Sequence, residues 1–217
     1  MEKLSNSIAN KVASELSLDD DKREVIAYGA FALMQMVLSI IFVFLCGLLF
    51  HVAFEALIIS FTASVLRKYS GGVHSSSPGI CNFIGTIVCV GQAVLISLLI
   101  SPLVNLKAVI ILGVLISVWS YFIIYKLAPV DSLSKPIVKE EKRKRMKKGS
   151  IILLSVYLII TVIFILFYIS SGDRKLLFYV LCIYSGILWQ AFTLTALGHL
   201  LISKVDLFLN HKIKIRR

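Results

Sequence analysis

Residues 25–66 read VIAYGAFALMQMVLSIIFVFLCGLLFHVAFEALIISFTASVL, and Glu55 is the only charged side chain among them. As one helix this run would be about 63 Å long at 1.5 Å per residue, roughly twice the thickness of the hydrocarbon core of a membrane. The chain must therefore fold back, and we place a hairpin near residues 47–53. This predicts a first span over about 25–47 and a second over about 52–66, short enough to be compatible with a re-entrant segment.

The whole chain has the composition of a membrane protein. Its mean hydropathy is +0.90, and 58% of its 217 residues are apolar, far outside the range of soluble globular proteins. Further apolar segments predict spans at about 80–100, 106–127, 150–169 and 176–200. We therefore expect an all-α, polytopic integral membrane protein with about six transmembrane helices, forming a single membrane domain over residues 1–217.

The N-terminal segment, residues 1–17, has the pattern of an amphipathic surface helix. Apolar residues recur at every fourth position, at Leu4, Ile8, Val12 and Leu16. Lys3 and Lys11 fall on other faces, as in a helix that lies on a membrane. The helix either anchors the N-terminus or helps to dock a substrate peptide that is itself amphipathic.

The basic residues predict the orientation of the spans. With six crossings, 20 of the 23 Lys and Arg residues lie on one side, and only Lys107, Arg174 and Lys175 lie opposite. The positive-inside rule then places both termini and the loop over 67–79 in the cytoplasm. Topology and anionic membrane lipids explain the net charge of +11 better than nucleic acid does, so we expect no nucleic-acid partner.

A polar loop between two apolar runs carries the candidate chemistry. Residues 67–81 read RKYSGGVHSSSPGIC, with His74 seven residues before Cys81. A thiol with an imidazole nearby can act as a nucleophile, with the imidazole as its general base. Ser77 followed by Pro78 predicts a helix start, so Cys81 falls in the first turn, where N–H groups near residues 80 and 81 can hold an oxyanion. Gly71 and Gly72 permit positive φ and close approach of a substrate.

Other interpretations of this loop remain open. The three serines at 75–77 are rival nucleophiles, but no aspartate or second base accompanies them. His74 and Cys81 are also compatible with chance neighbours in a membrane loop. A metal site needs three or four ligands, and no further Cys or His is close in sequence, so we expect neither metal nor cofactor. The alternative function is a transporter or channel subunit with the 67–81 loop as a gate and a path lined by Glu55, Gln92 and Gln190.

A basic loop follows the fourth predicted span, at residues 128–149, and contains KEEKRKRMKKG. Such runs usually fix topology and contact anionic lipids. They can also attract an acidic peptide tail toward Cys81, and the candidates for this contact are Lys135, Lys139, Lys142 and Arg143. Asp131, just before the run, is a candidate for the carboxylate that orients His74.

The pattern of Arg67, Gly71, Gly72, His74 and Cys81, together with the string APVDSLSKP at 128–136, resembles the accessory gene regulator B (AgrB) family, the membrane cysteine endopeptidases of Gram-positive quorum sensing. The resemblance implies that His74 and Cys81 are the catalytic pair and that Arg67 and Gly72 shape the site. It also implies an AgrD-like precursor peptide that loses its C-terminal part and closes to a thiolactone or lactone, and it suggests a homodimer.

Overall fold

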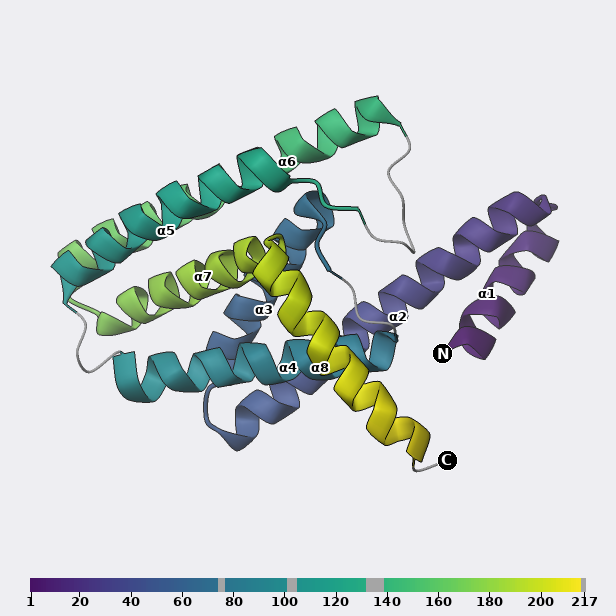
Figure 1. Cartoon of the computed structure of the whole chain (residues 1–217), viewed down its shortest axis with the longest axis horizontal. Helices are drawn as coiled ribbons and strands as arrows, with labels where there is room; N and C mark the ends of the chain where they lie inside the picture. Colours follow the sequence, from purple (N-terminus) through teal and green to yellow (C-terminus); the bar gives the residue numbers. More distant parts are fainter. Residues whose placement is uncertain (74–76, 101–104, 132–138, 216–217) are drawn as a thin grey trace. The chain divides into compact units, whose positions relative to one another are not determined.

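In the computed structural model, which describes residues 1–73, 77–100, 105–131 and 139–215, the chain is all-α, as predicted. The elements in chain order are α1 (Glu2–Glu15), α2 (Asp20–Leu49), α3 (Ala53–Ser70), α4 (Pro78–Leu95), the π-helical turn η1 (Ile96–Ile100), α5 (Leu106–Leu127), α6 (Glu140–Ser171), α7 (Arg174–Thr193) and α8 (Ala196–Ile215) (Figure 1). By length and composition, α2, α4, α5, α6 and α7 can cross a membrane. The protein is therefore a polytopic membrane protein.

The chain divides into two compact units, residues 1–42 and residues 43–217. The first unit contains α1, which agrees with the predicted amphipathic helix over residues 1–17. Small residues form the buried face of α1, namely Ser5, Ala9 and Ala13. Leu4 and Ile8 are exposed, as expected of a helix that offers apolar side chains to a lipid surface. The Asp19 carboxylate accepts a hydrogen bond from the Lys22 N–H at 2.9 Å and so caps the start of α2.

The second unit begins with the end of α2 and the predicted hairpin. The turn between α2 and α3 lies at residues 50–52, inside the predicted range. The Val52 N–H donates to the Gly47 carbonyl at 2.9 Å and closes this turn. A Cβ on Gly47 would lie 2.7 Å from the Ala53 Cα, so the glycine allows the two helices to meet closely.

The short helix α3 lies inside the second unit and packs against α4, α6 and α7. Ala56, Ile59 and Leu66 on its inner face are fully buried. Its 18 residues include three charged side chains, which keeps it out of the set of five apolar helices. A helix of this length spans about 27 Å at 1.5 Å per residue. Because protein covers its inner face, it needs less apolar character than a lipid-facing span, and six crossings remain our prediction.

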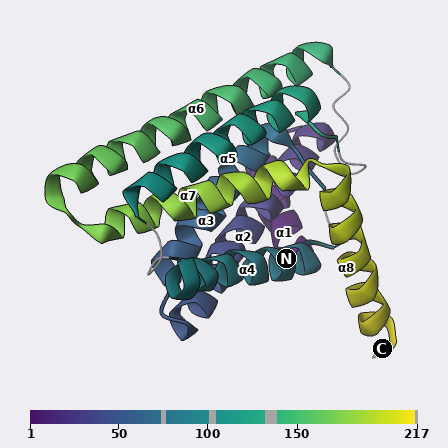
Figure 2. The same ribbon diagram turned by 60° about the vertical axis from the view of Figure 1, so that its left-hand side comes forward.

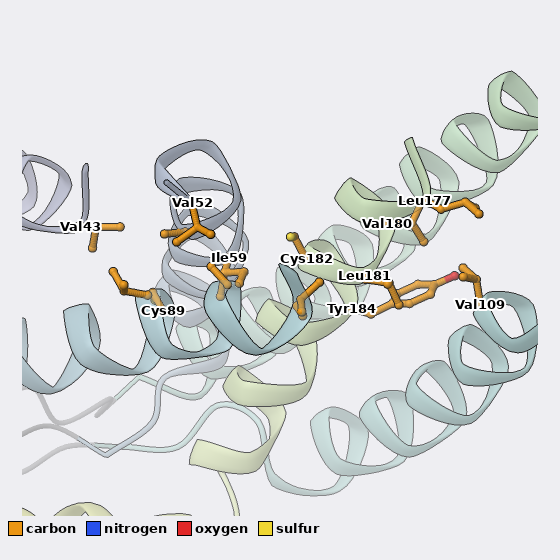
Figure 3. Close-up of a cluster of buried hydrophobic side chains, with 14 residues drawn as sticks. Val43, Val52, Ile59, Cys89, Val109, Leu177, Val180, Leu181, Cys182 and Tyr184 are labelled. Atoms are coloured by element: carbon orange, nitrogen blue, oxygen red, sulfur yellow. The ribbon is translucent and has the colours of Figure 1, made fainter. Parts of the chain in front are cut away.

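Helix α7 is the centre of the second unit. It packs against α3, α5 and α6, and more of its residues are buried than in the other apolar helices of the described chain. Figure 2 shows α5, α6 and α7 running alongside one another. Figure 3 shows Tyr184 of α7 directed at Val109 of α5, within a cluster that also contains Ile59 of α3. Gly186 permits the close approach to α3, because a Cβ there would lie 2.8 Å from the Thr62 Cβ.

Two predicted boundaries were wrong. The last span was expected over 176–200, but α7 ends at Thr193 and α8 begins at Ala196. The Thr195 hydroxyl accepts a hydrogen bond from the Gly198 N–H at 3.1 Å and so starts a new helix, a local cap hidden in an apolar run. The basic run over 139–149 was expected as a loop, but α6 already begins at Glu140. Its Lys and Glu residues are good helix formers, and Lys144 pairs with Glu140 at 3.0 Å.

Candidate active site

The candidate nucleophile lies where the sequence placed it, in the first turn of α4. Pro78 is the first helical residue, and the Ser77 hydroxyl accepts a hydrogen bond from the Ile80 N–H at 3.2 Å. The Cys81 N–H donates to the Ser77 carbonyl at 3.0 Å. Cys81 is a free, half-buried thiol. It therefore sits at the N-terminal, positive end of the α4 dipole.

The helix cap determines which N–H group is available to an oxyanion. The prediction was an N–H group near residues 80 and 81, and the N–H groups of Ile80 and Cys81 themselves already donate within the cap. Pro78 has no N–H, so the Gly79 N–H is the first-turn donor that the described cap leaves without an assigned acceptor. A Cβ on Gly79 would meet no atom closer than 4.0 Å, and this open space leaves room for a carbonyl group to approach.

Arg67, in the last turn of α3, connects the preceding loop to the nucleophile. Its guanidinium Nη2 donates a hydrogen bond to the Val73 carbonyl. It also interacts electrostatically with Cys81. Arg67 thus holds the Val73 carbonyl and lies within electrostatic range of Cys81. His74, the candidate base, is the next residue of this segment and lies outside the described residues, so its role stays a prediction.

The two glycines after α3 have backbone conformations that favour glycine. Gly71 has φ +70° and ψ −149°, and Gly72 has φ +131°. Gly71 pairs with Val130 in an isolated parallel bridge, and the Val130 N–H donates to the Ser70 carbonyl at 2.9 Å. A Cβ on Gly71 would overlap the Val130 carbonyl, and one on Gly72 would lie 3.1 Å from the Thr193 Oγ1. The 128–131 segment, which contains a cis Ala128–Pro129 bond, therefore packs directly on the loop.

Gln190 of α7 is a residue of this region that sequence reasoning did not assign to the peptidase site. Its Nε2 donates to the Gly71 carbonyl at 2.8 Å and to the Ser70 hydroxyl at 2.9 Å, and its side chain is almost completely buried. The sequence analysis considered it only as part of a transport path. A polar amide in an otherwise apolar span is the signal that marks it, because such residues usually serve a site or pair with another polar group.

The candidate residues of the basic segment lie at its start. Arg143 of α6 forms an ion pair with Asp131 at 2.7 Å, and both side chains are partly exposed. Lys139 and Lys142 are exposed. Lys135 lies outside the described residues. The Asp131 carboxylate is thus engaged by Arg143, and its predicted contact with His74 stays a prediction.

A pocket of about 360 Å³ opens beside the start of α4. Its walls come from α4, the Ser77 cap and α8, and the lining residues are Ser77, Gly79, Ile80, Phe83 and Leu209. Figures 1 and 2 show α8 leaving the end of α7 and passing near the first turn of α4. Three of the five lining side chains are apolar. The pocket can therefore receive an apolar group next to the candidate nucleophile.

Comparisons with known proteins identify the family of this chain. The family model for accessory gene regulator B matches residues 5–194. The chain belongs to the AgrB family. A putative AgrB-like protein of Clostridium perfringens strain SM101 is 44% identical over 210 residues, covering 97% of this chain and 98% of the relative. Putative AgrB-like protein 2 of C. perfringens strain 13 is 45% identical over the same shares. Putative AgrB-like protein 1 of strain 13 is 30% identical and covers 76% of this chain and 84% of the relative. No solved structure gives a significant match.

Membership of the AgrB family supports a part in the accessory gene regulator system for this membrane protein. The family match covers the α3–α4 loop, Cys81 and all of α7. The catalytic roles of His74 and Cys81, and the site-shaping roles of Arg67, Gly71 and Gly72, are carried forward as predictions.

Proposed function

We propose that this protein is a membrane cysteine endopeptidase that cleaves a small amphipathic quorum-sensing precursor, related to AgrD, and promotes ring closure of the product. The observation that supports this most is the placement of Cys81. A free thiol lies in the capped first turn of a helix, beside an arginine and a glycine loop that leads into a histidine. This combination supplies a thiolate, a base and an oxyanion donor within one short stretch of chain.

The first half of the reaction forms an acyl-enzyme. His74 accepts the proton of the Cys81 thiol, and the Sγ attacks the scissile carbonyl carbon. The Gly79 N–H donates to the oxyanion that forms. When the C–N bond breaks, the imidazolium returns its proton to the leaving amine, and the C-terminal part of the precursor departs. The N-terminal part stays on Cys81 as a thioester.

The second half of the reaction closes the ring. A Cys or Ser side chain of the bound peptide loses its proton to His74 and attacks the thioester carbonyl. The bond to Cys81 breaks, the proton moves from His74 to the Cys81 Sγ, and a thiolactone or lactone is released. One activated acyl group is exchanged for another, so no ATP is required. Attack by water would give a linear product, and a pocket that excludes water favours the ring.

The pocket beside α4 supplies a binding site for the peptide. We place an apolar side chain of the precursor, next to the scissile bond, among Ile80, Phe83 and Leu209. The exposed basic residues at the start of α6 attract an acidic tail of the peptide and anionic lipids. With α3 as a sixth crossing, the distribution of basic residues supports a cytoplasmic site and cytoplasmic termini.

The test is co-expression of a candidate amphipathic, acidic-tailed precursor with wild-type protein and with the variants Cys81→Ala, Cys81→Ser and His74→Ala. We expect the precursor to stay intact with all three, while each variant inserts into the membrane like the wild type. Cys46→Ala is the matched control, because Cys46 is also a free, half-buried thiol but lies on α2. Mass spectrometry detects the acyl-enzyme on Cys81. If Cys81→Ala still cuts, the peptidase proposal is wrong, and the loop has to be examined as a transporter gate.

A further inference from the structure

Residues 70–73, which we call the glycine loop, accept hydrogen bonds from donors on three different elements. The Ser70 carbonyl accepts a hydrogen bond from the Val130 N–H, the Gly71 carbonyl from the Gln190 amide, and the Val73 carbonyl from the Arg67 guanidinium. Two of these donors lie on the loop's own helix or on the neighbouring 128–131 segment. Gln190 is different, because it comes from α7, the buried centre of the helix bundle.

The burial of Gln190 is unfavourable for stability alone. Its side chain is 1% exposed, and its Oε1 has no hydrogen-bond partner in the described part of the chain. A buried amide oxygen without a partner costs about 1–3 kcal/mol, a cost that an apolar side chain of similar size would avoid. The helix packing around α7 therefore does not require an amide at this position. The two hydrogen bonds from Nε2, both directed at Ser70 and Gly71, are what the amide provides.

A second residue of α7, close to Gln190, also lies against the glycine loop. The Thr193 hydroxyl, one turn further along α7, donates to the Gln190 carbonyl at 2.8 Å. The same hydroxyl oxygen lies 3.1 Å from the position that a Cβ on Gly72 would occupy, and the Gln190 Nε2 lies 3.5 Å from it. The last turn of α7 thus meets the loop at two successive residues. Any shift of the Gln190 amide moves the backbone immediately before Val73 and the residues that follow it.

We propose that Gln190 is a positioning residue of the peptidase, which fixes the loop that carries the base relative to Cys81. The proposal rests on the proposed function. Gln190 does not touch the substrate. It acts through the Gly71 carbonyl, and its loss misplaces the segment leading to residue 74 while the pocket between α4 and α8 stays intact. Substitution of Gln190 should therefore lower kcat and leave KM unchanged.

The experiment measures kcat and KM for cleavage of a precursor by reconstituted wild-type protein, Gln190→Leu and Gln190→Glu. Leu removes both hydrogen bonds, and Glu keeps the shape but, when ionised, cannot donate. We expect kcat to fall by about 10²-fold in both variants, the effect of a misplacement of about 1 Å, with KM unchanged within about twofold. Gln190→Asn keeps a donor on a side chain one methylene shorter and should recover part of the loss.

The matched control is Gln92→Leu. Gln92 lies on α4, its Oε1 is also buried without a partner in the described chain, and it makes no contact with the glycine loop in the described structure. Its kcat should equal that of the wild type. Gln190 has no positioning role if Gln190→Leu matches Gln92→Leu, or if its loss appears in KM or in the folded fraction instead of kcat. If Cys81→Ala is inactive, either of these results rejects only the inference about Gln190. If Cys81→Ala still cleaves the precursor, the proposed function itself is rejected.

If Gln190→Leu fails to insert, Gly72→Ala tests the same contact from the loop. Its Cβ would lie tightly against the Thr193 Oγ1 at 3.1 Å and in ordinary contact with the Gln190 Nε2 at 3.5 Å, at a residue with positive φ. A fall in kcat at constant KM supports the inference. Wild-type turnover in Gly72→Ala contradicts it.

Discussion

Gly71→Ala is the substitution for which the structure predicts the largest local effect in the candidate site. Gly71 has φ +70° and ψ −149°, a region of backbone conformation that is nearly exclusive to glycine. An added Cβ would also overlap the Val130 carbonyl, which belongs to backbone and cannot rotate away as a side chain can. The chain must therefore either break the bridge to Val130 or move the loop away from it.

The expected loss of stability combines the cost of backbone strain with the cost of a lost hydrogen bond. Backbone strain of this kind costs about 1–3 kcal/mol. Loss of the hydrogen bond from the Val130 N–H to the Ser70 carbonyl adds about 1 kcal/mol. A loop that relaxes to avoid both costs moves the residues after Gly72 away from Cys81, and a shift of about 1 Å lowers turnover by about 10²-fold. We therefore expect cleavage to fall by at least that factor, with a smaller loss of folded protein.

The assay compares precursor cleavage and thermal unfolding in detergent for three alanine variants. Gly172→Ala is the first control, because Gly172 has φ +72° but a Cβ there would meet nothing within 4 Å. It isolates the strain of positive φ at the turn between α6 and α7. Gly91→Ala is the second, because Gly91 lies in α4 and a Cβ there would also meet nothing within 4 Å. We expect lowered stability but normal kcat for Gly172→Ala, and no loss for Gly91→Ala.

The result that refutes this reasoning is Gly71→Ala with wild-type kcat. The bridge to Val130 would then have no part in holding the site. A loss of activity that only follows the loss of folded protein, as in Gly172→Ala, would equally contradict it.

Three further predictions concern the surroundings of Cys81. Ser77→Ala removes the cap of α4, which should cost about 1 kcal/mol of stability and lower kcat, whereas Ser77→Thr should keep both. Asp131→Asn and Arg143→Gln each break a partly exposed ion pair, so each should change stability by less than about 1 kcal/mol. A fall in kcat of about 10²-fold in Asp131→Asn alone supports its role in orienting His74, and equal small effects contradict it. Leu209→Ala should raise KM about fivefold by removing about 1 kcal/mol of apolar contact at unchanged kcat, and an unchanged KM places the peptide elsewhere.

The sequence predicted the helices and the position of Cys81 at a helix start well because their signals are local. The hairpin after α2 follows from the length of an apolar run, and the first turn of α4 follows from Ser77 and Pro78. The break between α7 and α8 was missed because the Thr195 cap carries no charge and interrupts no apolar pattern. The sequence could not determine which N–H group near residues 80 and 81 is free. Whether the Ile80 N–H is free depends on the rotamer of Ser77, which spacing does not determine.

Gln190 could not be assigned from sequence, because its partners are 119 and 120 residues away along the chain. An amide in an apolar helix indicates that a polar partner exists, but it does not indicate which one. The same holds for Val130, whose contact with Gly71 joins two loops. Local patterns therefore predicted where the candidate nucleophile lies, while the groups that contact the neighbouring loop follow only from the packing of α3 against α7.

The hydrogen bonds of the glycine loop also explain how an irregular segment keeps a fixed position after α3. Where α3 ends, its last carbonyls lose their helical donors and need other partners. Val130, Gln190 and Arg67 satisfy three of the carbonyls between residues 70 and 73. The donors that make the loop compatible with its surroundings are thus the same ones that fix its position. A change that frees the loop should expose unsatisfied backbone as well as lower turnover, so removal of the Arg67 guanidinium should lower both kcat and stability, whereas variants of the pocket should alter KM alone.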